Sequence, residues 1–301
     1  MELRGILPPI PTPFRPDGTL DLESLKANLS RWNTTGLAGY LVLGSNGEAP
    51  HLAAEEKRAV LEAAREAIPP NLVFMAGTGE TTTRATIATT RMAAEAGADC
   101  ALVITPSFYR SKMTPEVLAD HYRAVAEASS IPILLYNVPA FTGLNFPLEA
   151  VSTLAEHENI VGIKDSLGDL AQLGRILSEP PEEFRVLTGS ATVFYPALCL
   201  GAHGGVLAVA CPLPERCVAI YEAFRAGDHA AARAGQFALL KVARLVTAAH
   251  GIGGLKAALD HLGYYGGPPR APLPTPGPEL KRAIAEALDA LGQVDAAALR
   301  P

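Results

Sequence analysis

The chain contains little cysteine and no pattern that would pair it. Its four cysteines, Cys100, Cys199, Cys211 and Cys217, include no C-x-x-C pair among 301 residues. A secreted domain held by disulfides would show a denser and more regular framework. We therefore expect reduced cysteines, most of them in the core of a cytoplasmic protein.

Long apolar runs and basic clusters are also absent. No run approaches the length of a membrane span, and Met1–Thr12 lacks the charged, apolar and small-residue order of a signal peptide. The formal net charge is −6, and no lysine–arginine run is present. Neither a membrane nor a nucleic acid is therefore expected as a partner.

Several common motifs of catalytic or cofactor sites are missing as well. The seven histidines show no H-E-x-x-H or other ligand spacing, so no metal site is expected. The G-x-S-x-G elbow of serine hydrolases does not occur. The stretch Gly77–Thr82, G-T-G-E-T-T, lacks the third glycine of a dinucleotide-binding loop. We therefore expect the protein to use no cofactor.

The chain does show short apolar runs that alternate with longer helical segments. The eight apolar runs are Gly5–Ile10, Gly39–Leu43, Leu72–Ala76, Cys100–Thr105, Ile131–Tyr136, Ile160–Lys164, Phe184–Leu187 and Gly204–Val209. Near-continuous apolar strands are typical of a parallel sheet that is covered on both faces. The helical segments between them are Leu20–Thr35, Ala53–Ile68, Thr83–Ala96, Pro115–Ala128, Pro147–Glu156, Leu167–Leu177 and Thr192–Leu200. This alternation predicts a (β/α)8 TIM barrel.

The pattern changes after the eighth strand. Four segments have helical character with no strand between them, and a Gly/Pro-rich connector, Gly263–Pro278, interrupts the series. The four segments are Pro214–Ala226, His229–Ala249, Gly254–Leu262 and Pro278–Leu291. We predict a barrel with the active site over residues 1–224 and a C-terminal helical region over residues 225–301.

The stretch Asn159–Asp165, N-I-V-G-I-K-D, is typical of a buried strand that ends in a lysine. Strand alternation places Gly162 and Lys164 on one face, and Val161 and Ile163 on the other. Lys164 is therefore expected to occupy space that Gly162 leaves open. Desolvation lowers the pKa of a lysine and makes it a nucleophile for carbonyl carbons. A lysine that only reaches water at the strand mouth is the simpler alternative.

Other polar groups are expected beside this lysine, because active sites of such barrels lie at the C-terminal strand ends. Tyr136 ends the fifth run, and Ser45 and Asn46 follow the second in the turn Gly44–Glu48. This set fits imine chemistry on a 2-oxo acid, in which the amine attacks the keto carbon, a phenol moves protons and turn amides hold the carboxylate. Each of these residues also has a simpler interpretation. Tyr136 can be a tyrosine at a strand end whose hydroxyl reaches water, and Gly44–Glu48 can be a turn followed by a helix cap. Glu48 can serve only to organise the loop.

Four stretches together carry a resemblance over nearly the whole chain: Gly44–Glu48, Tyr136–Gly143, Lys164–Ser166 and the turn Gly189-Ser190. The chain resembles the dihydrodipicolinate synthase / N-acetylneuraminate lyase family. The resemblance implies a barrel with C-terminal helices, a cytoplasmic homotetramer built as a dimer of dimers, and a class I lyase that forms a Schiff base with pyruvate. It implies Lys164 as the Schiff-base lysine, so that the covalent imine replaces any cofactor.

The resemblance also assigns the other site residues. It implies Tyr136 as the proton relay and places the pyruvate carboxylate on Ser45 and Asn46. It further implies three substrate contacts, at Ser166, Gly189 and Val206.

Within this family the chain is most similar to 4-hydroxy-2-oxoglutarate aldolase. Three stretches carry this likeness: G-S-N-G-E at Gly44–Glu48, Y-R-S-K-M at Tyr109–Met113, and the connector Gly263–Leu273. Two positions depart from the synthases. Phe141 stands where they carry an arginine for the second substrate's carboxylate, and a phenyl ring cannot make that contact. Phe108 stands where a tyrosine usually crosses the dimer interface. Either Tyr109 replaces it as a relay across an interface, or water does, or the relay is incomplete and turnover is slow.

The expected reaction is cleavage of 4-hydroxy-2-oxoglutarate, or a related 2-oxo acid, to pyruvate and an aldehyde such as glyoxylate. One alternative is a dihydrodipicolinate synthase that condenses pyruvate with aspartate semialdehyde, and sugar-acid aldolases are a third enzyme option. A non-catalytic sensor of 2-oxo acids is the alternative from a different class, and Phe108 is the residue that leaves it open.

Overall fold

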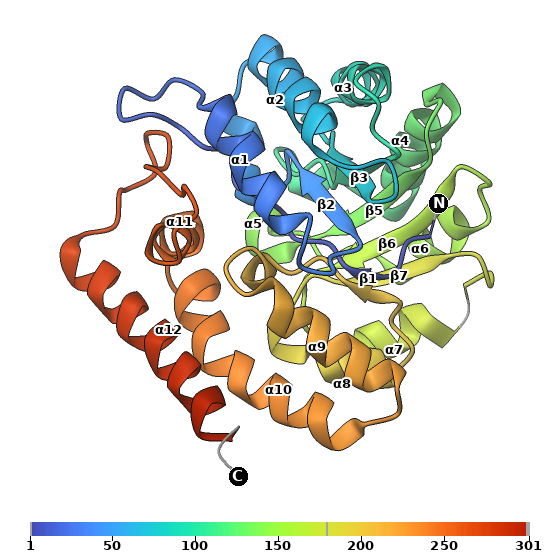
Figure 1. Cartoon of the computed structure of the whole chain (residues 1–301). Coiled ribbons are helices and arrows are strands. Elements are labelled where there is room, and N and C mark those ends of the chain that lie inside the picture. The colour runs from blue at the N-terminus through green and yellow to red at the C-terminus, as the bar shows by residue number, and fades with distance from the viewer. Residues whose placement is uncertain (1, 179, 299–301) are drawn as a thin grey trace.

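The computed structural model describes residues 2–178 and 180–298, with the backbone alone for 241, 248 and 292–298. Its centre is one sheet of eight parallel strands in the order β1-β8-β7-β6-β5-β4-β3-β2, which Figure 1 shows inside a ring of helices. The strands are β1 (Gly5–Ile6), β2 (Gly39–Val42), β3 (Val73–Gly77), β4 (Cys100–Ile104), β5 (Ile133–Asn137), β6 (Ile160–Asp165), β7 (Arg185–Thr188) and β8 (Gly204–Gly205). The predicted TIM barrel is confirmed.

The barrel is closed between its first and second strands by the chain that follows β1. Pro9 forms a parallel bridge with Leu41, and the backbone N–H of Ile10 donates to the Leu41 carbonyl at 3.0 Å. The first and last predicted strands, to Ile10 and Val209, were too long. Pro8 and Pro9 have no N–H for a regular ladder, and the chain after β8 winds into the 3-10 turn η5 (Ala208–Ala210).

Helices follow the strands as expected. They are α1 (Leu22–Trp32), α2 (Ala54–Ala67), α3 (Thr83–Glu95), α4 (Pro115–Ala128), α6 (Leu148–Ala155), α7 (Leu170–Ser178), α8 (Phe194–Cys199) and α9 (Pro214–Arg225). Asp21 caps α1 by accepting a hydrogen bond from the Ser24 backbone, as its position before the apolar repeat predicts. The short α5 (Pro139–Thr142) was not predicted, because one turn is too short to show a periodicity.

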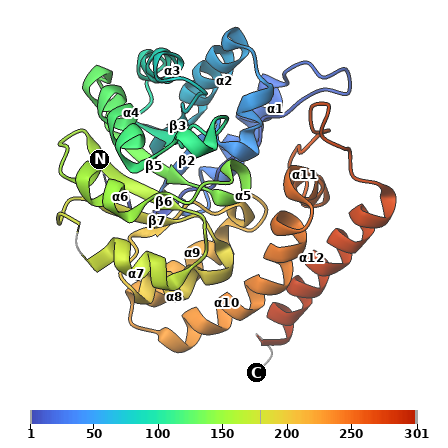
Figure 2. The same cartoon turned by 180° about the vertical axis from the view of Figure 1, so that it is seen from behind.

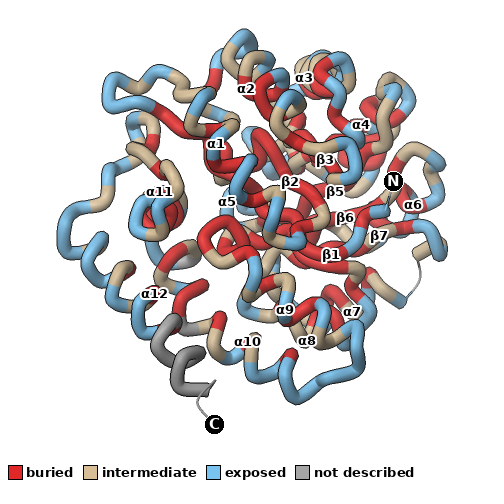
Figure 3. Tube along the Cα trace, in the orientation of Figure 1, coloured by how far each residue is buried: buried red, intermediate tan, exposed pale blue. Residues whose placement is uncertain are grey.

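The core has two layers because each strand of a parallel barrel is buried on both faces. One apolar cluster fills the barrel interior and includes Leu41, Met75, Leu102, Leu134 and Leu187. Two larger clusters lie between the strands and the surrounding helices. Figure 3 shows the buried strands at the centre and exposed backbone on the outer helix faces.

The C-terminal helices α10 (His229–Ala243), α11 (Gly251–His261) and α12 (Pro278–Ala298) extend the barrel on one side, as the two opposite views in Figures 1 and 2 show. The five-residue π-helical stretch η6 (Arg244–Ala248) follows α10 directly. The boundary at residue 224 stays a prediction; it falls one residue before α9 ends. Residues 1, 179 and 299–301 of the two predicted regions lie outside the described residues.

No single helix among the described residues is long and apolar enough to cross a membrane. Among the described residues, one bent pair of helices, His229–Thr247 and Gly251–His261 with 115° between its parts, reaches that length and composition together.

Candidate active site

Lys164 and Tyr136 lie side by side inside the barrel near the C-terminal strand ends. They are paired in register on β6 and β5, so their side chains point the same way into the interior. Lys164 is only 4 % exposed, and its Nζ lies 4.2 Å from the centre of the Tyr136 ring. The structure therefore brings the predicted amine and the predicted phenol together in a buried environment.

The glycine that makes room for Lys164 is not the predicted one. A Cβ on Gly162 would collide with the Arg185 carbonyl oxygen at 2.2 Å, so Gly162 serves the close approach of β6 and β7. A Cβ on Gly189 would lie 2.9 Å from Cε of Lys164. The space beside the lysine is thus provided by the turn after β7, and the expectation about Gly162 was wrong.

Strand alternation also fails at the start of β6. The register between β5 and β6 shifts between Ile133 and Leu134. Val161 packs against the interior cluster, whereas Ile163 belongs to the cluster outside the barrel. The prediction that these two residues share a face was wrong, because a bulge adds one residue to one strand and breaks the period of two.

The turn after β2 reaches the same place from the other side of the barrel. Ser45 and Asn46, both half-buried, lie in the 3-10 turn η1 (Ser45–Gly47). The Ser45 Oγ and the Tyr136 Oη are 3.5 Å apart, and either one can donate. Tyr136 therefore stands between the lysine and the turn that is predicted to hold a carboxylate.

The three remaining predicted contacts also lie at this end of the barrel. Ser166 directly follows β6, and its Oγ would be 1.8 Å from a Cβ on Gly189. Val206 directly follows β8 and donates its N–H to the Thr188 carbonyl at 2.8 Å. Its side chain is buried in the same interior cluster as Tyr136. The fold therefore places Ser166, Gly189 and Val206 at the same end of the barrel as Lys164 and Tyr136, but their roles stay predictions.

A cavity of about 500 Å³ opens above these strand ends. Its inner wall is formed by strand ends and the turns that follow them, and includes Ser45, Gly77, Thr78, Thr105 and Tyr136. Its outer wall is mostly apolar and includes Pro50, Pro106, Phe108, Phe141, Ile252 and Leu273. A volume of this size is in the range of small-molecule binding sites.

The aromatic residues that depart from the synthase pattern stand at the outer wall. Phe108 and Phe141 line the cavity and are 78 % and 66 % exposed in the single chain. Tyr109 packs edge-on against Phe108, with ring centres 5.0 Å apart, but it is not part of the cavity wall. Its possible relay role across an interface stays a prediction.

Two buried carboxylates near the site had no predicted catalytic role. Asp165 lies next to Lys164 on β6; it accepts a hydrogen bond from Asn137 Nδ2 at 2.6 Å, and burial raises the pKa of its carboxyl. Glu48 ends the turn that contains Ser45 and Asn46, which is predicted to hold the substrate carboxylate. Its side chain pairs with Lys256 of α11. Lys256 was missed altogether, because a single lysine in an apolar helix usually reaches water and no local pattern links it to a residue two hundred positions away.

Comparison with known proteins adds the family. Residues 2–291 match the model of the Dihydrodipicolinate synthetase family. The chain belongs to this family. It is therefore an enzyme, a carbon–carbon lyase of the dihydrodipicolinate synthase type, as the sequence motifs predicted.

The similar proteins differ in their own activities. A 4-hydroxy-tetrahydrodipicolinate synthase of Methanoculleus marisnigri is 40 % identical and is aligned over 89 % of this chain and 92 % of its own. A probable mitochondrial 4-hydroxy-2-oxoglutarate aldolase of Emericella nidulans is 34 % identical over 97 % of both chains. A prophage protein of Escherichia coli K12, solved in complex with pyruvate, is 30 % identical with a TM-score of 0.91, over 97 % of this chain and 99 % of its own.

Proposed function

We propose that the protein is a class I aldolase that cleaves 4-hydroxy-2-oxoglutarate, or a related 2-oxo acid, to pyruvate and an aldehyde such as glyoxylate. The observation that carries this proposal is the buried amine of Lys164 4.2 Å from the Tyr136 ring, with the Tyr136 hydroxyl next to Ser45. The proposal needs no cofactor, because the imine itself withdraws the electrons.

The first half of the reaction would form the imine. The unprotonated Nζ of Lys164 attacks C2 of the substrate, and the resulting carbinolamine loses water as a proton reaches its oxygen. In this proposal, Tyr136 delivers and recovers these protons, because its ring lies 4.2 Å from the Lys164 Nζ. The Ser45-Asn46 turn would hold the C1 carboxylate through hydroxyl and backbone N–H groups.

The second half would break the carbon–carbon bond. A base takes the proton of the C4 hydroxyl, the C3–C4 electron pair moves toward the protonated imine, and the aldehyde leaves. The remaining enamine takes a proton at C3, and water then hydrolyses the imine to release pyruvate and the free Lys164 amine. In this proposal the Tyr136 hydroxyl takes part in each of these proton transfers.

The aldolase assignment is supported by the Emericella nidulans relative, whose similarity extends over 97 % of both chains. Phe141 counts against the synthase alternative, because it lines the cavity where the synthases carry an arginine for the carboxylate of aspartate semialdehyde, and a phenyl ring cannot make that contact. Since glyoxylate also carries a carboxylate, Phe141 does not select one particular aldolase substrate. Homotetramer formation and a cytoplasmic location stay predictions.

A synthase that condenses pyruvate with aspartate semialdehyde is the second candidate. The observation in its favour is the 40 % identity to the Methanoculleus marisnigri synthase. Phe141 argues against it for the reason just given. The sensor alternative has less support, because a protein that only binds a 2-oxo acid has no need of a buried amine.

Borohydride trapping with pyruvate tests the proposal. Intact mass should show one reduced adduct, and peptide mapping should place it on Lys164 and not on Lys256, which is even more completely buried. The Lys164→Ala variant should give no adduct. Cleavage of 4-hydroxy-2-oxoglutarate and condensation with aspartate semialdehyde, assayed side by side, then separate the two enzymes.

Two negative results have different meanings. A protein that binds pyruvate in a calorimeter but gives no adduct would support the sensor. A protein that neither binds nor traps pyruvate would show that the ligand is wrong.

A further inference from the structure

Glu48 is buried at the end of the turn that is proposed to bind the substrate carboxylate. Its side chain is fully enclosed, with the residue 1 % exposed, yet it belongs to the wall of the cavity. The Oε1 atom lies 2.7 Å from Nζ of Lys256, and the Oε2 atom accepts the backbone N–H of Arg270 at 2.8 Å. A carboxylate in this position is held from two separate parts of the C-terminal region.

The backbone of Glu48 is part of the turn itself. Its N–H donates to the Ser45 carbonyl at 3.2 Å, and its own carbonyl accepts the N–H of His51 at 2.8 Å. Its φ is +54°, a left-handed conformation that costs free energy in any residue other than glycine. Such a conformation persists only where the surroundings hold it, and here the side-chain contacts provide that restraint.

Lys256 is the other half of the pair and is 0 % exposed. Besides Glu48, its Nζ donates to the Pro268 carbonyl at 3.0 Å and lies 4.5 Å from the Phe14 ring centre. Burial lowers the pKa of the Lys256 amine, and the neighbouring Glu48 carboxylate opposes this effect. The pair therefore joins α11 to the loop after β2.

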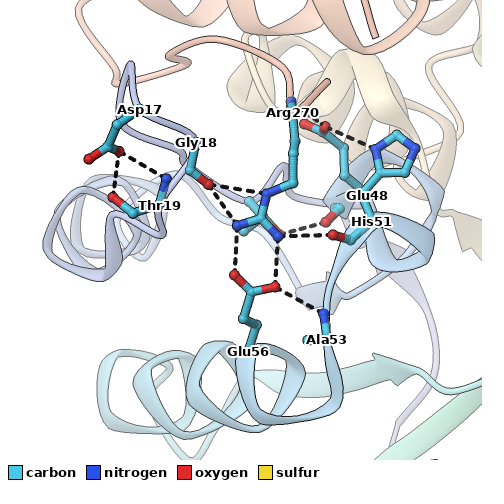
Figure 4. A network of polar contacts seen from close by, with 10 residues as sticks. Asp17, Gly18, Thr19, Glu48, His51, Ala53, Glu56 and Arg270 are labelled. Atoms are coloured by element: carbon cyan, nitrogen blue, oxygen red, sulfur yellow. Dashed lines mark hydrogen bonds and ion pairs between the residues drawn. The ribbon is translucent and has the colours of Figure 1, made fainter. Parts of the chain in front are cut away.

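A second ion pair fixes the connector beside it, as Figure 4 shows. The Arg270 guanidinium binds both oxygens of Glu56 in α2, at 2.7 and 2.6 Å. It also donates to the carbonyls of Gly18 and His51, at 2.7 and 2.9 Å. The Arg270 backbone N–H that meets Glu48 is thus held in place by its own side chain.

We propose that Glu48 and Lys256 are positioning residues that set the geometry of the Ser45-Asn46 turn and so the affinity for the substrate carboxylate. The inference rests on the proposed function, in which this turn binds pyruvate. A buried ion pair adds little net stability compared with apolar residues of the same size, so stability alone does not explain a pair at this place. A fixed turn and a neutralised carboxylate in the cavity wall do explain it.

The charges of Glu48 and Lys256 predict how the half-saturating pyruvate concentration differs among variants of the pair. Removing Lys256 takes away the ammonium group that lies 2.7 Å from the Glu48 carboxylate, so this carboxylate would repel pyruvate more strongly at the proposed anion site. Removing both charges abolishes the repulsion but also loosens the turn. The half-saturating pyruvate concentration should therefore be highest in Lys256→Met, intermediate in the double variant Glu48→Gln/Lys256→Met, and lowest in the wild type.

The experiment measures the rate of borohydride-trapped adduct against pyruvate concentration, together with thermal unfolding. We expect the half-saturating concentration to rise by about tenfold or more in the double variant, the effect of a lost hydrogen bond to a charged group. The amount of adduct at saturating pyruvate should stay near that of the wild type. If Lys256→Met does not fold, the double variant and Glu48→Gln, which leave no unpaired carboxylate, give the comparison.

Asn159→Ala is the matched control. The Asn159 Nδ2 group lies within hydrogen-bonding distance of the carbonyls of Ala126, Ser129 and Ile131. Asn159 stands directly before β6 and so at the opposite end of the barrel from Lys164. The Asn159→Ala substitution should lower the unfolding temperature without changing the half-saturating pyruvate concentration. An equal rise in this control, or an unchanged concentration in the folded double variant, would overturn the inference.

The same experiment separates the two proposals. Trapping in the wild type with unchanged affinity in the variants overturns the positioning role and leaves the aldolase intact. If the wild type binds pyruvate without an adduct, calorimetric dissociation constants replace the trapping rates and test the turn by itself. A wild type that does not bind pyruvate at all overturns both proposals.

Discussion

Gly189 leaves the space that the Lys164 side chain occupies. A Cβ atom at residue 189 would stand 2.9 Å from Cε of Lys164 and 1.8 Å from Oγ of Ser166. These two side chains come from β6 and from the residue after it, whereas Gly189 lies in the turn after β7. The position of the nucleophile is therefore determined by a contact between neighbouring strands.

The first prediction concerns this contact. Gly189→Ala should reduce the rate of pyruvate trapping by about a hundredfold, because misplacing a reacting group by about 1 Å is enough for such a loss. The control is Gly174→Ala in α7, where a Cβ meets nothing within 4 Å and helix propensity favours alanine. Rapid trapping in Gly189→Ala would show that the lysine can move away at little cost.

Tyr136→Phe should separate imine formation from turnover. The variant keeps the ring that contacts Lys164 but loses the hydroxyl next to Ser45, so the adduct should still form slowly while turnover falls about a hundredfold to ten-thousandfold. The control is Tyr122→Phe, which loses a buried hydroxyl that donates to the Val103 carbonyl at 3.0 Å. Steady-state rates are the measurement, and equal losses in the two variants would remove Tyr136 from the mechanism.

Phe141→Arg should shift the preference among aldehydes. A guanidinium at the outer wall of the cavity can bind a carboxylate through two hydrogen bonds, so kcat/KM for aspartate semialdehyde should rise by roughly ten- to a hundredfold. Phe237→Arg in α10 is the control, because Phe237 is similarly exposed and does not line the cavity. No gain in the first variant would mean that Phe141 does not determine the second substrate.

The fourth prediction concerns pH and stability. Burial lowers the pKa of His121 to about 4, from an ordinary value of 6.5. Between these values the unfolded chain holds the extra proton, so the free energy of unfolding rises with pH. The contribution of His121 to the free energy of unfolding is about 3 kcal/mol in total. It is fully present above pH about 6.5 and is lost as the pH falls toward 4.

Urea unfolding of His121→Gln at several pH values measures this contribution. Between pH 4 and 6.5 the free energy of unfolding should change less with pH in the variant than in the wild type. His229 is exposed, so His229→Gln is the control. Identical pH dependences in the wild type and His121→Gln would contradict the lowered pKa.

Much of the fold could be predicted because local patterns report burial directly. Apolar runs such as Cys100–Ile104 are buried on both faces, and the helices begin at recognisable caps such as Asp21. The ends of β1 and β8 were less predictable, since Ile10 and Val209 remain buried after the regular ladder has ended. Burial without strand pairing cannot be distinguished from a strand in a sequence.

The chain's own sequence determined the barrel and the place of Lys164 and Tyr136, because strand period and strand order bring the ends of β5 and β6 to one edge. Only the tertiary structure decided what surrounds them. The register shift before Leu134, the contact of Gly189 with Lys164 and the pairing of Glu48 with Lys256 all join segments that are distant in the chain. Such contacts depend on how close two backbones approach, and no spacing within either segment records that distance.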